Sequence, residues 1–211
     1  MTGRQTLTLS PTAACPGRVP DFCRLLGPVA WQRLPPAVRA RFAGHADAVT
    51  LYRGRMRVTA SWWGRLFAHA CRLIGTPVAP FEGADVPVTV RVYDRADGSG
   101  TVWERRYEFP GRAPTIVSST KQLDDDGALV EALNAGLHMR LAVFEEARAL
   151  HFVSKGYFFR VGRLCIDLPA WFLPGPTHVV HEDLGDGHFR FAMHTEHRRL
   201  GQMFHQEGVF A

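Results

Sequence analysis

The sequence predicts a mainly β (α+β) fold, a strongly curved antiparallel sheet or barrel with N-terminal helices and one packing helix. From Val86 onward, apolar and polar residues alternate with the two-residue period of a strand. Turn-forming residues interrupt this pattern at short intervals, which indicates roughly nine or ten strands with antiparallel neighbours. A sheet of that length normally curls, closes or splits into two layers, so we expect a barrel-like shape.

The N-terminal part predicts two helices. Asp21–Leu26 is a short helical segment, and a second helix begins near Leu34, where prolines in the first turn are well tolerated, and extends to about Ala43. Along this second helix an apolar stripe recurs every four residues, at Leu34, Val38 and Phe42. The stripe predicts a face that packs against the rest of the protein.

A strand is predicted over Val49–Thr59, followed by a helix over Trp62–Ile74 that Ser61 would cap. The broad apolar face of this helix comprises Trp62, Trp63, Leu66, Phe67, Ala70 and Ile74. We expect that face to pack across the sheet. Contact with a membrane surface is the alternative, which we disfavour because the polar face is small and not rich in lysine.

The remaining chain consists of predicted strands and tight turns. Valines alternate from Val86 to Val92, and Asp97–Gly100 is typical of a hairpin turn into the strand Thr101–Phe109. Further turns are expected at Pro110–Pro114, Asp124–Gly127, Glu145–Arg148 and Gly185–Gly187. Later strands are expected at Thr115–Leu123, Leu137–Val143, Leu150–Arg160, Leu164–Leu168 and Gln202–Phe210, with two more flanking the turn at Gly185.

The length of 211 residues fits a flexible leader over 1–19 and a single β-rich domain over 20–211. No run of about 18 apolar residues could span a membrane, and the N-terminus lacks the pattern of a secretory signal. The four cysteines, Cys15, Cys23, Cys71 and Cys165, show no metal or redox spacing. We expect free thiols in the cytoplasm, and a disulfide of Cys15 or Cys23 is the alternative.

The net charge of +5 comes almost entirely from arginine, a bias that a GC-rich genome is sufficient to explain. Arg53, Arg55 and Arg57 alternate along one face of a predicted strand and would form a small basic stripe. Acidic residues are scattered through the rest of the chain, and no nucleic-acid-binding motif accompanies the stripe. We therefore expect a solvated strand face and no nucleic-acid partner.

The main candidate site centres on Arg105. Trp103, Tyr107 and Phe109 share one face of their strand, and Arg105 lies among them on that face. A guanidinium on an apolar face is costly unless it is paired. Either a carboxylate inside the fold or a bound ligand must neutralise it.

Glu182 and Glu131 are the internal carboxylates considered for this pairing. If a ligand takes that role instead, it would lie in a cavity with apolar walls and a few polar groups. The predicted ligand-binding residues are Trp103, Arg105, Tyr107, Tyr157 and Glu182.

Lys155 and Tyr157 form a second candidate, expected to share one strand face with His151, Val153 and Phe159. A Lys-Tyr pair can transfer a proton at a carbonyl group. An exposed lysine beside a packing tyrosine explains the same residues and is the interpretation we favour. The weak candidates for catalysis are Arg105, Tyr157 and Lys155.

Histidines crowd the C-terminal strands, where His181, His194 and Glu196 could meet around a metal if the strand register permits. Surface histidines produce the same pattern, and Asp124–Asp126 is typical of a solvated turn. We therefore expect no metal site. No Gly-x-Ser-x-Gly motif supports nucleophilic catalysis, and no cofactor is expected.

Seven short segments occur in an order that resembles the uncharacterised domain-of-unknown-function family 4166. They are Leu26–Gly27, Leu34–Phe42, Val102–Tyr107, Ser154–Tyr157, Leu168–Gly175, Asp186–Phe191 and Leu200–Gly201, within residues 20 to 210. The resemblance implies a domain that occurs alone or behind a saccharopine-dehydrogenase-like, nucleotide-binding domain. No Gly-x-Gly-x-x-Gly follows a strand in this chain, so a dehydrogenase activity is not implied for it.

Together these features predict a domain that binds a hydrophobic, anionic or carbonyl-bearing small molecule in an interior cavity. Two alternatives to a ligand-binding function remain open. A cofactor-independent cyclase or isomerase would employ the same cavity, with Arg105 stabilising negative charge and Tyr157 or a histidine moving a proton. An accessory subunit of a separate reductase, or a homodimer, would dock through the helix Trp62–Ile74 or an edge strand.

Overall fold

The protein is represented by a computed structural model that describes residues 17–44, 48–73, 81–162 and 164–211. Most of the predicted leader, Cys15 and Ile74 lie outside these residues. The helices are α1 (Phe22–Leu26), α2 (Pro28–Arg33), α3 (Pro36–Phe42) and α4 (Trp62–Leu73), with 3-10 turns η1 (Asn134–Gly136) and η2 (Ala170–Phe172). The first strands are β1 (Thr50–Ala60), β2 (Gly83–Asp94), β3 (Thr101–Tyr107), β4 (Thr115–Leu123) and β5 (Leu129–Ala132). The later strands are β6 (Leu137–Glu146), β7 (Ala149–Val161), β8 (Leu164–Asp167), β9 (Thr177–Gly185), β10 (His188–His197) and β11 (Gly201–Phe210).

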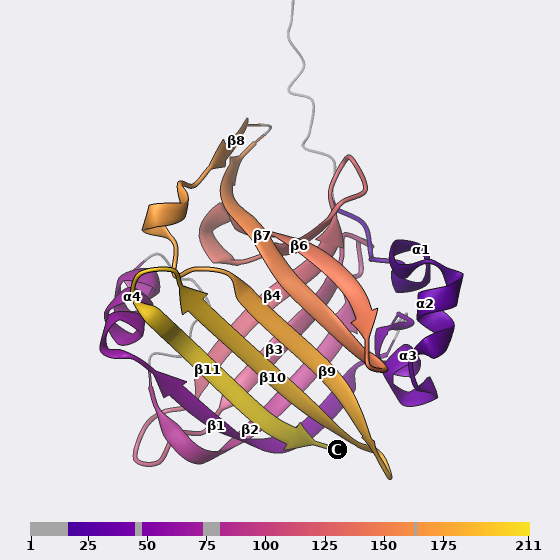
Figure 1. Ribbon diagram of the computed structural model, residues 1–211, viewed down its shortest axis with the longest axis horizontal. Coiled ribbons are helices and arrows are strands. Elements are labelled where there is room, and N and C mark those ends of the chain that lie inside the picture. The colour runs from indigo at the N-terminus through magenta and orange to yellow at the C-terminus, as the bar shows by residue number, and fades with distance from the viewer. Residues whose placement is uncertain (1–16, 45–47, 74–80, 163) are drawn as a thin grey trace, which may run out of the picture.

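Ten antiparallel strands form a closed barrel (Figure 1). The strands follow one another around the wall as β6, β5, β4, β3, β2, β1, β11, β10, β9 and β7, and pairing between β6 and β7 closes the circle. The short strand β8 pairs with β7 alone and projects beyond the rim. The predicted mainly β fold with N-terminal helices is thus confirmed, in its closed form.

Alternation along the strands sets which side chains enter the barrel. The valines of β2 at positions 86, 88, 90 and 92 are all buried, as their spacing predicts. Trp103 and Tyr107 of β3 are buried on the same inner side, and the β2–β3 hairpin turns at Gly98 with φ of 70°. Local turn chemistry and the two-residue period therefore account for the β2–β3 hairpin.

Helices α1 to α3 close one end of the barrel with aromatic and aliphatic side chains. The predicted stripe of Leu34, Val38 and Phe42 is fully buried there. Phe42 stacks on Trp103 with ring centroids 5.4 Å apart and lies 5.6 Å from Phe152 of β7. Figure 1 shows these three helices on the opposite side of the barrel from α4. The helix α2 and the strand β5 were not predicted from the sequence.

Helix α4 lies against the start of β11, and Ser61 caps it by accepting a hydrogen bond from the Gly64 amide at 3.1 Å. Its packing face differs from the prediction. Gly64 and Ala68 are buried, whereas Trp62 and Trp63 are exposed. A Cβ atom at Gly64 would overlap the carbonyl oxygen of Met203, so the helix approaches the sheet through its smallest residues. None of the described helices is long and apolar enough to cross a membrane.

Candidate functional site: an apolar cavity with a charged inner wall

The half of the barrel opposite α1–α3 contains a cavity of about 630 Å³. Inward side chains of the barrel strands form its walls, and most of them are apolar. Among these apolar residues are Val117, Leu137, Met139, Leu141, Phe152, Phe159, Val179, Phe191, Met193 and Phe204. The cavity reaches the surface between α4, η2 and the turn that joins β10 to β11, where its lining residues Trp63, Trp171 and Leu200 are exposed. A largely apolar, concave space of this size is typical of a small-molecule site.

Arg105 of β3 enters this cavity from the wall, where the strand pairs with Val90 of β2 and Val117 of β4. Its guanidinium carbon lies 5.8 Å from the centre of the Phe191 ring. Among the described residues it makes no hydrogen bond and no salt bridge. The position of Arg105 on the inner, apolar face is as predicted, and its charge is not matched by a carboxylate of its own.

Lys121 and Glu131 lie beside Arg105 and form a buried ion pair between the adjacent strands β4 and β5. Lys121 Nζ is 3.2 Å from Glu131 Oε1, and the same carboxylate oxygen accepts a hydrogen bond from Ser119 at 2.5 Å. The register Lys121↔Glu131 points both side chains inward. Lys121 Nζ also lies 5.4 Å from the Trp103 ring centre and 5.3 Å from that of Phe152.

Burial and mutual attraction change the ionisation of this pair. Burial lowers the pKa of Lys121, an effect that the Glu131 carboxylate partly offsets and that Arg105 reinforces. Burial alone would raise the pKa of Glu131, but the charges of Lys121 and Arg105 and the hydrogen bond from Ser119 outweigh it and lower the pKa. Glu131 is therefore ionised, and Lys121 and Ser119 hold its carboxylate, so that Arg105 has no carboxylate of its own among the described residues.

Two further polar groups of the cavity are satisfied within the protein. Tyr107 donates a hydrogen bond to Gln206 Oε1 at 2.9 Å, and burial raises its pKa. Tyr157 lies 3.3 Å from Thr177 Oγ1, which in turn lies 3.0 Å from Thr195 Oγ1. Burial also raises the pKa of Tyr157, so both phenols stay protonated at neutral pH. They can donate hydrogen bonds but are poor acids.

Trp103 lies between the cavity and the N-terminal helices, in an aromatic core to which Phe42 of α3 contributes. It contacts a small void shared with Arg105 and His181. His181 is fully buried among aromatic rings, and its Nδ1 has no hydrogen-bond partner in the described part of the chain. Burial, together with the charges of Arg41, Lys121 and Arg105, holds its pKa well below the ordinary value of 6.5. The imidazole is therefore neutral.

The structure separates two predicted site residues from the cavity. Glu182 lies on the outer wall of β9, where its carboxylate binds Arg190 of β10 at 2.7 Å, so it does not pair with Arg105. Lys155 is exposed, whereas Tyr157 is buried and faces the cavity. The expectation that these two residues share a face is wrong because a β-bulge intervenes. Arg140 pairs with Gly156 and Leu141 with Ser154, which leaves Lys155 unpaired and reverses the alternation beyond it.

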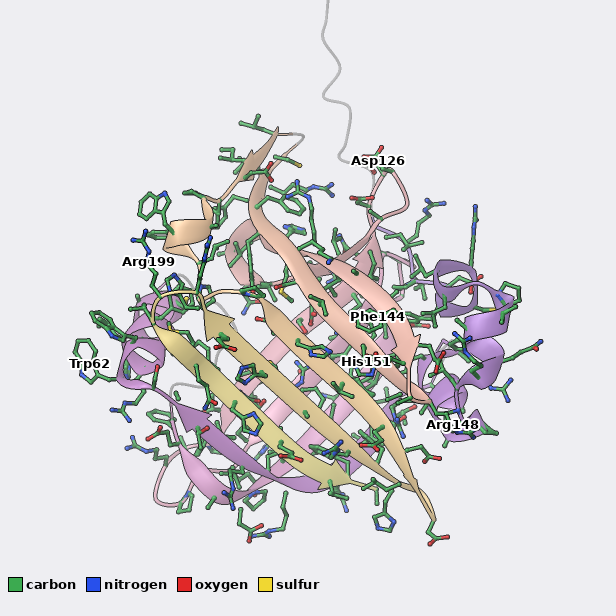
Figure 2. The ribbon with its side chains drawn as sticks, in the orientation of Figure 1. Trp62, Asp126, Phe144, Arg148, His151 and Arg199 are labelled. Carbon is green, nitrogen blue, oxygen red and sulfur yellow. The ribbon has the colours of Figure 1, made fainter. Side chains whose placement is uncertain are left out.

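The postulated metal ligands do not converge, although His178, His194 and His205 lie opposite one another on β9, β10 and β11. His181 points inward, whereas His194 lies on the outer wall with Glu196 Oε2 at 3.3 Å, so the postulated ligand set is divided between two faces. His151 and His178 approach to 3.0 Å on the outside of the barrel, beside Phe144 (Figure 2). Within the described residues, no group of three potential ligands could hold a metal ion.

Sequence reasoning missed Lys121 and Gln206, and it considered Glu131 only as a partner for Arg105. A usable signal was present in β4, where Val117, Ser119 and Lys121 alternate on one face. The short Asp124–Gly127 turn then lets β5 pair with β4, which brings Glu131 opposite Lys121. What the sequence did not disclose was the short strand β5 itself, which positions the carboxylate.

The comparisons with known proteins identify a family and name no activity for it. A family model described as "Domain of unknown function (DUF4166)" matches residues 34–210, which include α3 and all strands of the barrel. No curated protein matches the chain.

Proposed function

For this chain, which belongs to the DUF4166 family, we propose that the barrel binds a hydrophobic small molecule with an anionic or carbonyl-bearing head group. The observation that supports the proposal is the guanidinium of Arg105 at the wall of an apolar cavity, where it makes no salt bridge with a described residue. Arg105 faces about 630 Å³ of space, and among the described residues only Glu131 offers it a carboxylate, which Lys121 already holds at 3.2 Å. A half-buried cation without its own counter-charge is costly, and an anionic ligand reduces that cost.

The arrangement also gives the ligand an orientation. Arg105 and the Lys121–Glu131 pair lie on the inner wall, whereas the rings of Trp63, Trp171 and Phe172 surround the opening. A polar head would bind at Arg105, whose planar guanidinium can donate two parallel hydrogen bonds to a carboxylate, sulfonate or phosphate. The apolar part would extend along Leu137 and the other aliphatic side chains toward the mouth.

Tyr107 and Tyr157 would contribute in different ways. Tyr157 lines the cavity and could share its hydroxyl hydrogen-bond network with an oxygen of the ligand. Tyr107 holds Gln206 at the wall, and Gln206 also faces the cavity. We keep Trp103 as a supporting residue because it lies beneath Lys121 in the core and does not line the main cavity. We also propose a cytoplasmic location, which the free thiols of Cys23 and Cys165 support.

Native mass spectrometry of the protein purified from its own host tests the proposal. Wild type, Arg105→Met and the matched control Arg106→Met would be compared, because Arg106 is the exposed neighbour on the outer face of the same strand. We expect a small molecule retained by wild type and by Arg106→Met and lost from Arg105→Met. An empty wild type together with an Arg105→Met variant that unfolds would mean that Arg105 is structural.

A second candidate function is favoured by the cluster of three ionisable side chains on one inner wall. A cofactor-independent cyclase or isomerase would use Arg105 to stabilise developing negative charge, with Glu131 as a carboxylate that lines the same cavity. The raised pKa of Tyr157 argues against that phenol as the proton donor. If the barrel is an enzyme, Glu131→Gln should retain a molecule whose chromatographic retention differs from that of the wild-type ligand; a binding module would yield the same molecule from both.

A further inference from the structure

Large apolar side chains surround the opening of the cavity and point into solvent. We call this set the mouth rim; it consists of Trp62, Trp63 and Leu66 on α4, Trp171 and Phe172 at η2, and Leu200 between β10 and β11. Trp171 is 79% exposed, and Trp62 and Phe172 are each 60% exposed. Exposed aromatic residues gathered at one site mark a surface that contacts something else.

The three rim segments come from distant parts of the sequence but meet on one side of the barrel. In Figure 1, α4 lies beside the start of β11, and the orange segment that follows β8 lies next to them. Figure 2 shows Trp62 and Arg199 projecting outward on that same side. The cavity lining confirms the juxtaposition, because Trp63, Trp171 and Arg199 all contribute to it.

The charged residues of the rim segments are all basic. Residues 61–73, 169–176 and 197–201 contain four arginines and no aspartate or glutamate. Of these arginines, Arg65 binds the adjacent Glu82 at 2.9 Å, and the exposed Arg198 and Arg199 make no side-chain salt bridge among the described residues. The neighbouring Glu196 faces His194. The rim therefore combines apolar rings with a net positive charge.

We propose that the mouth rim docks on an anionic lipid surface and that the cavity exchanges its ligand there. Tryptophan and phenylalanine insert at the boundary between head groups and acyl chains, while arginines bind anionic head groups. A partner protein would have to match three separate apolar projections, whereas a lipid surface deforms around them. The exposed side chains of the mouth rim alone support the proposed membrane contact. The proposed exchange of ligand also depends on the proposed function, that the cavity binds a ligand.

Co-sedimentation with lipid vesicles tests this inference on the whole chain. Vesicles of phosphatidylcholine alone would be compared with vesicles of equal parts phosphatidylcholine and phosphatidylglycerol, at low and high salt. We expect binding to the anionic vesicles that falls with salt, accompanied by a blue shift of tryptophan emission. Trp171→Ser/Phe172→Ser should weaken that binding about tenfold or more, since two large apolar side chains are lost from the contact.

Two matched pairs of controls make the result specific. Val29→Ser/Phe144→Ser removes exposed apolar side chains away from the mouth and should leave vesicle binding unchanged. Arg198→Glu/Arg199→Glu should abolish the preference for anionic vesicles, whereas Arg53→Glu/Arg57→Glu on the outer wall of β1 should not. Binding that is lost with the β1 variant and kept with both rim variants would overturn the inference.

Failure of docking and failure of ligand binding remain distinguishable. Arg105→Met should bind vesicles as wild type does, because Arg105 lies inside the barrel. A ligand retained in mass spectra with no vesicle binding would refute the docking surface alone. If the rim variant instead converts a dimer into a monomer and wild type ignores vesicles, the rim is a self-association interface and the inference is wrong.

Discussion

Lys121 and Glu131 are buried side chains whose ionisation depends on each other and on the nearby charge of Arg105. Lys121 Nζ lies 3.2 Å from the Glu131 carboxylate, so removing Lys121 would leave that buried carboxylate without its partner. Replacing both members of a buried pair by apolar residues can be nearly neutral, whereas removing one member strands the other.

Lys121→Met is therefore expected to destabilise the protein by about 3 kcal/mol, near the lower end for a broken buried pair, because Arg105 still attracts Glu131. Lys121→Met/Glu131→Leu should recover most of that loss. Chemical denaturation measures both. The control is Lys155→Met, the chain's other lysine, which is exposed and should change the free energy of unfolding by less than about 0.5 kcal/mol. A double variant no more stable than the single one would contradict the pairing.

His181 gives the fold a pH dependence of known sign. Its pKa in the folded protein lies well below the ordinary 6.5, so the unfolded chain takes up the proton first as the pH falls. The contribution of His181 to the free energy of unfolding is thus complete well above pH 6.5, the pKa in the unfolded chain, and decreases as the pH falls through that value. From pH 7.5 to 5.5 the wild type should lose about 1 kcal/mol on this account.

His181→Phe should not show this loss, and the exposed His188→Phe should show it in full. The free energy of unfolding, measured by denaturant titration across this pH range, gives the comparison. A His181→Phe profile parallel to that of wild type would show that another group causes the pH dependence.

Helix α4 shows how an element can bury a different face from the one its amphipathic pattern indicates. The tryptophans dominate the pattern, yet the helix contacts β11 through Gly64 and Ala68 because only small residues permit the close approach. The bulge in β7 is a comparable case, since one inserted residue reverses the alternation between Lys155 and Tyr157. Strands β2 and β3 have no such irregularity between them, and their inward faces were predicted correctly.

Gly64→Ala tests the close approach of α4. Alanine in a helix interior is normally about 1 kcal/mol better than glycine. Here the added methyl group would meet the Met203 carbonyl oxygen, so we expect a net destabilisation of about 1–3 kcal/mol. His69→Ala, an exposed position on the same helix, should be close to neutral in thermal unfolding. An increase in stability for Gly64→Ala would mean that α4 does not pack in this way.

The whole molecule is a barrel that is packed at one end and open at the other. The closed form of the sheet follows from strand number and short turns, which the sequence displays, and the packed end follows from the stripe on α3. The cavity could not be predicted to the same degree. The cavity depends on contacts between residues that are distant in the sequence. Tertiary packing decides the position of Glu131 on the unpredicted strand β5, the bulge at Gly156 and the close approach of α4.

The central claim is that Arg105 makes an apolar cavity selective for a negative charge. It is tested most directly by two fluorescent probes with the same ring system, anionic 1-anilinonaphthalene-8-sulfonate and neutral N-phenyl-1-naphthylamine. Titrated into wild type, Arg106→Met and the rim variant Trp171→Ser/Phe172→Ser, the anionic probe should bind more tightly than the neutral one. Arg105→Met should bind both with similar affinity. An unchanged ratio of the two affinities in Arg105→Met would contradict the claim.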